Sequence, residues 1–248
     1  MKNILFFIIV LSLGITLSAQ NYDKQVFPTS RGDLTIVPIG HASIMFVWND
    51  LTIHIDPVLR EADYLRFPDA DVILLTHHHG DHTDKEAVNM LYTDTTRVIL
   101  TEQSLEKLTE LDLDHAQVMH YWDTTSFKGL GVEAIPAYNI EHKRPNGEPY
   151  HPRGVGNGYV LTFENYKVLI GGDTEDIPEY EKLRDYNIDA AFLPMNIPYT
   201  MTPRMVAHAA SMIRPRILYP YHYGDTNTDE LFELMVDDPW LEIRILSF

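Results

Sequence analysis

Four histidines and two aspartates fall within the eleven residues 74–84, in the stretch LLTHHHGDHTD. His77 and His79 are two residues apart, and Asp81 and His82 follow after a glycine that relaxes the backbone. The loop therefore offers two adjacent pairs of side chains that can bind metal. One ion cannot easily take four ligands from so short a loop, whereas two neighbouring ions can. The chain has no cysteine, so any metal must be held by nitrogen and oxygen ligands.

Two more candidate ligands stand at the ends of predicted strands. Asp173 follows the apolar run VLIGG, and His222 ends the run ILYPYH. The histidine loop itself follows DVILLT, a continuous apolar run typical of a strand buried on both faces. Because the ends of such strands meet at one edge of an α/β sheet, we expect these side chains to converge there. Two metal ions also need an anionic ligand to share, and the strand ends supply candidates.

The elements that must position these residues alternate between strands and helices. Strands are predicted at 33–39, 42–48, 51–55, 71–76, 97–101, 116–122, 131–138, 158–163, 166–172, 189–194, 216–223 and 240–246, and helices at 84–92, 102–111, 177–186, 202–213 and 228–236. The polar stretch between Tyr138 and Tyr159 is too long for an ordinary hairpin loop, and long insertions are often functional. No linker interrupts the pattern, so residues 20–248 are predicted to form one layered α/β domain.

The charge of the chain limits its partners. It has 248 residues, with 36 acidic residues against 19 lysines and arginines, and a net charge of -17. Binding to nucleic acid needs a basic surface, so we expect no nucleic-acid partner.

The N-terminus has the layout of a secretory signal peptide. In residues 1–19, one lysine precedes an apolar run that ends in small residues. The apolar run is short for a membrane span, which needs about 20 residues. We therefore expect a bacterial protein that is periplasmic or secreted, with no stable membrane anchor after signal cleavage.

The motif THHHGDH matches the H-x-H-x-D-H signature of the metallo-β-lactamase superfamily. The segments GGDT and PYHYG resemble its later aspartate and histidine motifs, in the family's order. IGHASIMF and LTIHIDP are similar to the first strands of its lactonase-like and N-acyl-phosphatidylethanolamine phospholipase-like branches. The resemblance covers nearly all of the chain after the signal segment. It implies a four-layer αββα sandwich with metal ions at the edge of the two sheets.

The resemblance also implies which residues bind the metal ions. The implied ligands are His77 and His79 for the first ion, Asp81, His82 and His222 for the second, and Asp173 as a bridge between the two. Many family members take a further histidine for the first ion from the strand end that reads PAYN in this chain.

Asn139 stands at that position, so the further ligand of the first ion has three candidates. His151, in YHPRG, is our choice because related branches carry a similar segment. His142 is the next choice, and Asn139 could bind through its carbonyl oxygen. His41 is a candidate to contact substrate or to support a ligand. Asp56, in HIDP, is a candidate to fix a ligand imidazole, although a strand-end turn explains it equally well.

The site implies a hydrolase. Two divalent ions, most simply Zn²⁺ with Mn²⁺ or Fe²⁺ as alternatives, can share a bridging water and lower its pKa. The hydroxide would attack an ester, lactone or phosphodiester of a small-molecule or lipid-like substrate, with Asp81 orienting it. The alternative is a non-catalytic periplasmic relative that binds metal or ligand, supported only by the missing histidine at position 139.

Overall fold

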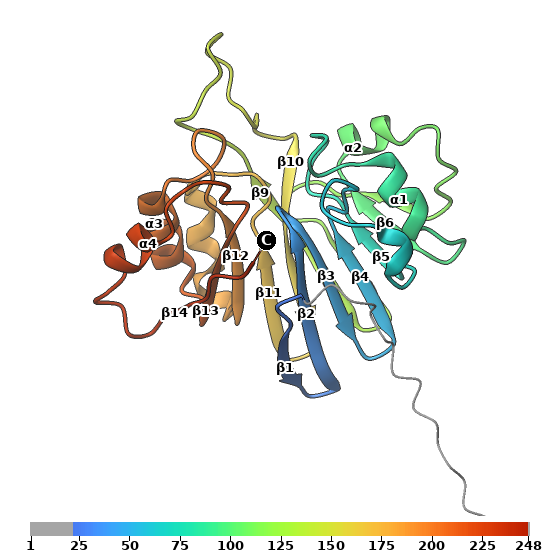
Figure 1. The fold of residues 1–248 in the computed structure, drawn as a ribbon, viewed down its shortest axis with the longest axis horizontal. Helices are drawn as coiled ribbons and strands as arrows, with labels where there is room; N and C mark the ends of the chain where they lie inside the picture. Colours follow the sequence, from blue (N-terminus) through green and yellow to red (C-terminus); the bar gives the residue numbers. More distant parts are fainter. Residues whose placement is uncertain (1–21, 248) are drawn as a thin grey trace, which may run out of the picture.

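The computed structural model describes residues 22–247, so the signal segment predicted at residues 1–19 lies outside the described residues. Two mixed sheets, each of seven strands, pack face to face, and helices cover both outer faces (Figure 1). The fold is the four-layer αββα sandwich predicted above. Within residues 22–247, no helix is both long enough and apolar enough to span a bilayer.

The first sheet takes its strands from the first half of the chain, in sequential order. Its antiparallel part consists of β1 (Gln25–Thr29), β2 (Gly32–Gly40), β3 (Ser43–Trp48) and β4 (Leu51–Ile55). Its parallel part continues from β4 with β5 (Val72–Leu74), β6 (Arg97–Leu100) and β7 (Ala116–Val118). Parallel neighbours need crossover connections, and these contain η1 (Tyr64–Arg66), α1 (Lys85–Leu91) and α2 (Glu102–Lys107).

The second sheet repeats this plan with the second half of the chain. Its antiparallel part consists of β8 (Thr124–Phe127), β9 (Leu130–Ala137), β10 (Gly156–Phe163) and β11 (Tyr166–Ile170). Its parallel part continues from β11 with β12 (Ala190–Pro194), β13 (Ile217–Tyr221) and β14 (Glu242–Ile243). The crossovers contain η2 (Pro178–Tyr186), α3 (Pro203–Ile213) and α4 (Asp229–Leu234).

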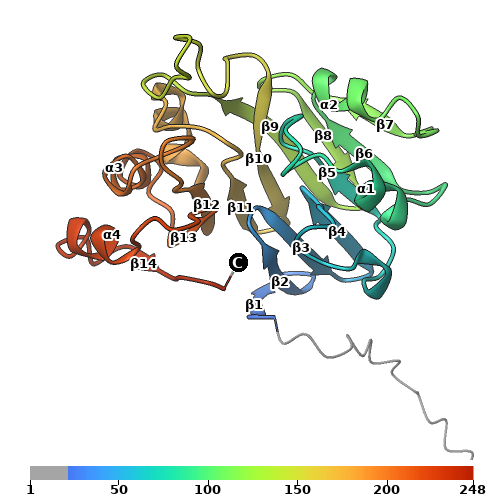
Figure 2. The ribbon, with the colours of Figure 1, turned by 45° about the horizontal axis from the view of Figure 1, so that its top comes forward.

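Apolar side chains pack in three layers that correspond to the three interfaces of the sandwich. The central layer lies between the two sheets. One outer layer packs α1 and the end of α2 against the first sheet, and the other packs η2, α3 and α4 against the second. Figure 2 shows both helical layers on the outside of the sheets. Because both faces of each sheet are covered, the central strands are buried, as their continuous apolar runs predicted.

The structure differs from the prediction in several elements: β1 and β8 were not predicted, β7 and α2 end earlier than predicted, and two further elements change more. The helix predicted at 177–186 is the 3-10 helix η2. Its buried side chains, Tyr180 and Leu183, are three residues apart, which matches the three residues per turn of a 3-10 helix. The strand predicted at 240–246 is only the two-residue edge strand β14, since just Glu242 and Ile243 pair with β13.

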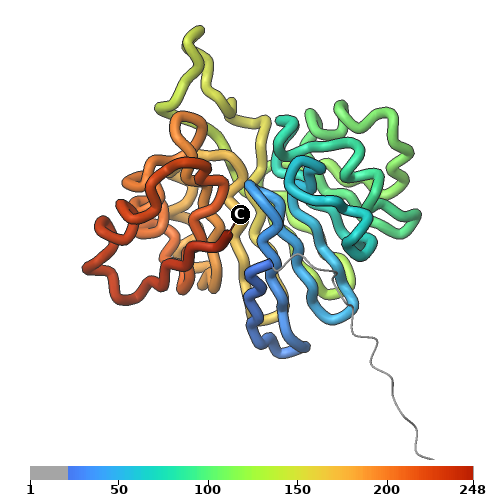
Figure 3. The backbone as a smooth tube through the Cα atoms, viewed as in Figure 1, coloured from blue at the N-terminus to red at the C-terminus, as the bar shows by residue number. Residues whose placement is uncertain are grey.

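The carboxyl ends of several strands meet at one edge of the sandwich, where the candidate residues lie. The turn from β2 to β3 carries His41, Asp56 follows β4, the histidine loop follows β5, Asp173 lies just after β11 and His222 follows β13. The insertion between β9 and β10 (residues 138–155) projects as a long hairpin-like excursion (Figures 1 and 3). The path of the backbone thus gathers residues that are up to 181 positions apart between His41 and His222.

Candidate metal centre

Three histidines from two segments form a first group of metal-binding side chains. His77 and His79 lie on the loop after β5, with His77 Nε2 3.0 Å from His79 Nδ1. His151, from the insertion, joins them, and one ring nitrogen of each lies within 4.8 Å of the others. Imidazole nitrogens in this arrangement suit ions such as zinc, iron, nickel and copper.

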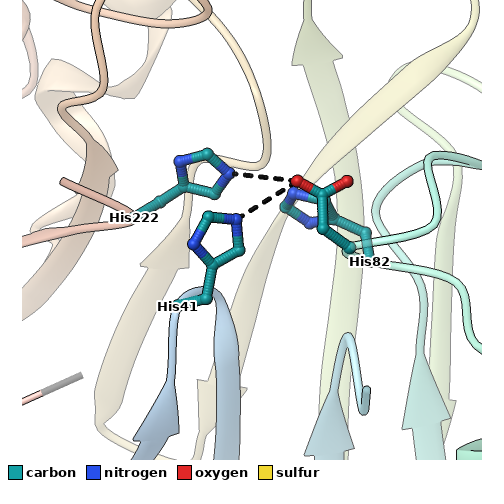
Figure 4. A group of neighbouring side chains, drawn as sticks. His41, His82 and His222 are labelled. Carbon is teal, nitrogen blue, oxygen red and sulfur yellow. Dashed lines mark hydrogen bonds and ion pairs between the residues drawn. The ribbon is translucent and has the colours of Figure 1, made fainter. Parts of the chain in front are cut away.

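A second group lies beside the first and contains Asp81, His82, His222 and His41. Figure 4 shows the imidazoles of His41, His82 and His222 together, and its dashed lines mark the contacts of His41 and His222 with the Asp81 carboxylate. Its Oδ2 lies 3.2 Å from His41 Nε2 and 3.9 Å from His222 Nε2. The side chains of His82 and His222 are buried, whereas 37% of the Asp81 side chain is exposed. Asp81 is therefore the member of this group most open to a bound substrate.

Asp173 lies between the two groups, and each of its carboxylate oxygens faces one of them. Oδ1 lies 3.3 Å from His82 Nε2 and 3.6 Å from His222 Nε2. Oδ2 lies 3.1 Å from His151 Nε2 and 3.8 Å from His77 Nε2. The carboxylate therefore has the orientation needed to touch two ions at once.

Several of the converging atoms have no hydrogen-bond partner among the described residues. These buried atoms are His82 Nε2, His222 Nε2 and Asp173 Oδ1. Leaving a buried polar atom unpaired costs about 1–3 kcal/mol, so three such atoms facing one point require an explanation. A cation at that point would satisfy all three, and the donor set therefore fits a metal ion.

Asp56 and Thr76 hold one of these histidines in place. Asp56 Oδ2 lies 2.7 Å from His82 Nδ1 and accepts a hydrogen bond of 2.6 Å from the Thr76 hydroxyl. With the Nδ1 proton donated to Asp56, Nε2 of His82 is directed at Asp173. Burial by itself would lower the pKa of His82, but Asp173 and Asp56 together raise that pKa well above its usual value. A metal ion at Nε2 would compete with the proton that these carboxylates attract.

Asn139 supports His151 in a similar way. Its Oδ1 lies 2.7 Å from His151 Nδ1 and also accepts a 2.8 Å hydrogen bond from the His151 backbone. Its Nδ2 donates to Glu175 Oε1 and to the Tyr199 carbonyl oxygen. The amide therefore directs Nε2 of His151 at Asp173, and the Asn139 amide oxygen is itself engaged by His151.

Glu175 fixes the start of the insertion, and sequence reasoning missed it. Its carboxylate accepts hydrogen bonds of 2.7 Å from the backbone of Ile140, Glu141 and His142. These bonds lower the pKa of Glu175, although burial acts in the opposite direction. The only sequence signal was its position two residues after Asp173. His142 Nδ1 also lies 2.8 Å from Glu175 Oε1, outside both metal-binding groups.

Three of the nine described non-glycine residues with positive φ lie at the same edge. His41, Asp56 and His222 have φ angles of 51°, 43° and 52°, in the left-handed region that non-glycine residues rarely adopt. Gly172, just before Asp173, has φ 65°, and a Cβ there would lie 2.6 Å from the Asn157 carbonyl oxygen. Such strain persists only where the surrounding structure imposes it, and it is common at functional sites.

Two of the buried imidazoles, those of His77 and His222, are neutral at neutral pH. Burial lowers the pKa of His77 well below its usual value and lowers the pKa of His222 to about 4. Burial would raise the pKa of Asp173, but His222, His82 and other histidines hold it well below its usual range. His77 and His222 thus offer unprotonated nitrogens and Asp173 an ionised carboxylate, which are the forms that bind metal, whereas a metal ion must displace the proton that His82 holds.

A pocket of about 490 Å³ opens over this centre. Besides the histidines and carboxylates it is lined by Gly80, Arg144, Tyr150, Asn196 and Tyr199. The centre can therefore be reached by a small molecule, as a catalytic metal site requires.

The sequence of the chain matches the model of a family described as the beta-lactamase superfamily domain, over residues 35–222. The chain belongs to the metallo-β-lactamase superfamily. It is similar to a UPF0173 metal-dependent hydrolase of Methanopyrus kandleri, with 26% identity over 222 residues that cover 86% of this chain and 96% of the relative.

Solved structures agree with this membership. A protein from Parabacteroides distasonis, provisionally named a metal-dependent hydrolase, is 44% identical with a TM-score of 0.84, covering 92% of this chain and all of that chain. A metallo-β-lactamase fold protein from Bacillus subtilis shares the fold, at 13% identity and a TM-score of 0.65 over 89% of this chain and 92% of that chain. This superfamily member is a metal-dependent hydrolase. Its likeness to the lactonase-like and phospholipase-like branches stays a prediction.

Proposed function

We propose that this hydrolase binds two divalent metal ions, most simply Zn²⁺, and cleaves an ester, lactone or phosphodiester. The observation that carries the proposal is the orientation of Asp173, whose two oxygens face different groups of imidazoles. A site for one ion does not need a carboxylate placed between two such groups.

The ligands of the proposed ions follow from the two groups. The first ion would be held by His77, His79 and His151, the second by Asp81, His82 and His222, and Asp173 would bridge them. Zinc is favoured because its ligands in proteins are commonly histidine and carboxylate. Mn²⁺ and Fe²⁺ remain alternatives, since imidazole and carboxylate also bind them.

When bound, a pair of divalent ions supplies a nucleophile from water near neutral pH and polarises the oxygen of the scissile group. The residues of the chain do the rest. Asp81, whose side chain is 37% exposed, is placed to accept a hydrogen bond from the nucleophile and orient it. Burial would raise the pKa of Asp81, but the hydrogen bond with His41 lowers it, so Asp81 stays ionised.

The non-catalytic alternative loses its support in this arrangement. It depended on the absence of a histidine at position 139. Asn139 instead holds His151, and His151 brings an imidazole to the first group.

The test is the metal content of the purified protein, measured by elemental mass spectrometry. We expect about two ions per chain in the wild type and strong depletion in Asp173→Ala, with folding checked by circular dichroism. A panel of esters, lactones and phosphodiesters then identifies the substrate class. One ion per chain would contradict the binuclear site, and no metal after reconstitution would contradict the whole mechanism.

A further inference from the structure

The pocket over the metal centre contains one permanently positive side chain. Among the described residues that line it, Arg144 is the only lysine or arginine. It lies in the insertion between β9 and β10, far from the motif residues in sequence. The chain as a whole carries a net charge of -17, so the guanidinium at this pocket is opposite in sign to the net charge of the protein.

Arg144 is held in position by its own hairpin. Its backbone N–H donates to the Glu148 carbonyl oxygen, and its carbonyl oxygen accepts from the Gly147 N–H. The guanidinium donates a 3.2 Å hydrogen bond to the Tyr150 carbonyl oxygen and lies 5.1 Å from the centroid of the Tyr150 ring. The Tyr150 ring meets Tyr199 edge to face at 5.1 Å. Arg144 therefore belongs to an ordered aromatic wall of the pocket.

No carboxylate pairs with Arg144 within 4 Å in residues 22–247. Arg153, in the same insertion, is different, because it forms a 2.7 Å ion pair with Glu179 and lies over the Tyr138 ring. Glu148 is the acid across the hairpin from Arg144, and its carboxylate accepts from Asn146 instead. The guanidinium of Arg144 thus keeps free donors, and a planar guanidinium is well suited to bind carboxylate or phosphate oxygens.

We propose that Arg144 binds an anionic group of the substrate, a carboxylate or a phosphate that is separate from the bond to be cleaved. Tyr150 and Tyr199 pack against the organic part that joins this anion to the scissile group at the metal ions. The substrate class is therefore a small anionic ester, lactone or phosphodiester. This inference rests on the proposed function, because it concerns the pocket of the same hydrolytic site.

The test compares two esters that differ in one charge. para-Nitrophenyl butyrate is neutral, and mono-para-nitrophenyl succinate carries a carboxylate at its far end. The variant Arg144→Gln removes the guanidinium. Lys143→Gln removes the same charge one residue away, from a side chain that does not line the pocket.

We expect Arg144→Gln to raise the KM of the succinate ester about 10- to 100-fold, as expected for loss of a charge-assisted hydrogen bond. Its kcat/KM should fall much less for the butyrate ester than for the succinate ester, and Lys143→Gln should behave as the wild type with both esters. Equal losses with both esters would overturn the proposal, as would equal losses in the two variants.

A binding measurement separates this proposal from the proposed function. Succinate and phosphonoacetate are titrated calorimetrically into the zinc-loaded wild type and the two variants. Weaker binding in Arg144→Gln alone supports the anion site even where the wild type cleaves neither ester, an outcome that counts against ester hydrolysis instead. Equal binding by all three proteins overturns the anion site.

Discussion

Replacing Asn139 by alanine tests how the first metal ion is held. The amide makes four hydrogen bonds: two to His151, one to Glu175 and one to the Tyr199 carbonyl oxygen. Both polar atoms of the amide are thus engaged by protein groups. The variant therefore leaves every proposed ligand in the chain and removes only the support of one of them.

The expected magnitude follows from these contacts. Removing a side chain that orients a ligand imidazole typically weakens metal binding about 10- to 100-fold, or about 1.4–2.8 kcal/mol. Each lost hydrogen bond contributes about 0.5–1.5 kcal/mol, so the free energy of unfolding should fall by about 2–6 kcal/mol. The free energy of unfolding of a typical domain is about 5–15 kcal/mol. The variant should therefore remain folded for most values of the expected loss.

The assay is a zinc titration against a chelating indicator, with urea unfolding measured in parallel. We expect one site of wild-type affinity and one weakened site in Asn139→Ala. The control is His142→Ala, which removes a histidine of the same insertion that lies outside both metal-binding groups. It should keep two sites of wild-type affinity.

Two results would refute the reasoning. If Asn139→Ala binds two zinc ions as tightly as the wild type, the amide does not position His151. If His142→Ala loses one ion while His151→Ala keeps both, His142 is the third ligand of the first ion and our assignment of His151 is wrong.

Three further predictions concern the surroundings of the centre. Asp56→Asn should weaken the second metal site about 10- to 100-fold in the same titration, because the buried carboxylate no longer orients His82. His41→Ala should lower kcat about 10-fold or more while elemental analysis still finds both ions, because the bond to Asp81 is lost; loss of an ion would make His41 a ligand instead. His54→Leu should reduce the acid sensitivity of folding, measured by urea unfolding between pH 6.5 and 4. Burial lowers the pKa of His54 from 6.5 to about 3, so below pH 6.5 only the unfolded chain takes up the proton. The wild type should therefore lose about 1.4 kcal/mol per pH unit relative to the variant, and parallel pH profiles would contradict this.

Much of the centre could be predicted from the sequence because its residues sit in local motifs. His77, His79, Asp81 and His82 are separated by so few bonds that any compact turn keeps them together. Asp173 follows an apolar strand, as the histidine loop does, and buried strands of one sandwich end at a shared edge. The spacing of apolar residues and the composition also predicted most strands and the layered fold, since both sheets bury continuous apolar runs. The edge strands β1 and β8, which are only half buried, were missed.

The tertiary structure alone decided which side chains of the insertion reach the centre. His142 and His151 were both candidates in the sequence, and only the path of the insertion places His151 beside His77. That path depends on Glu175, which binds backbone groups 33 to 35 residues earlier in the chain.

Spacing in the sequence restricts geometry only over a few residues, whereas these contacts depend on how two loops fold against each other. The orientation of the two carboxylate oxygens of Asp173 and the position of Arg144 at the pocket also depend on contacts between distant segments. The sequence by itself therefore determined the family, the layered fold and the core of the metal motif. Long-range packing determined the third imidazole of the first group, the orientation of the bridging carboxylate and the charge that a substrate meets.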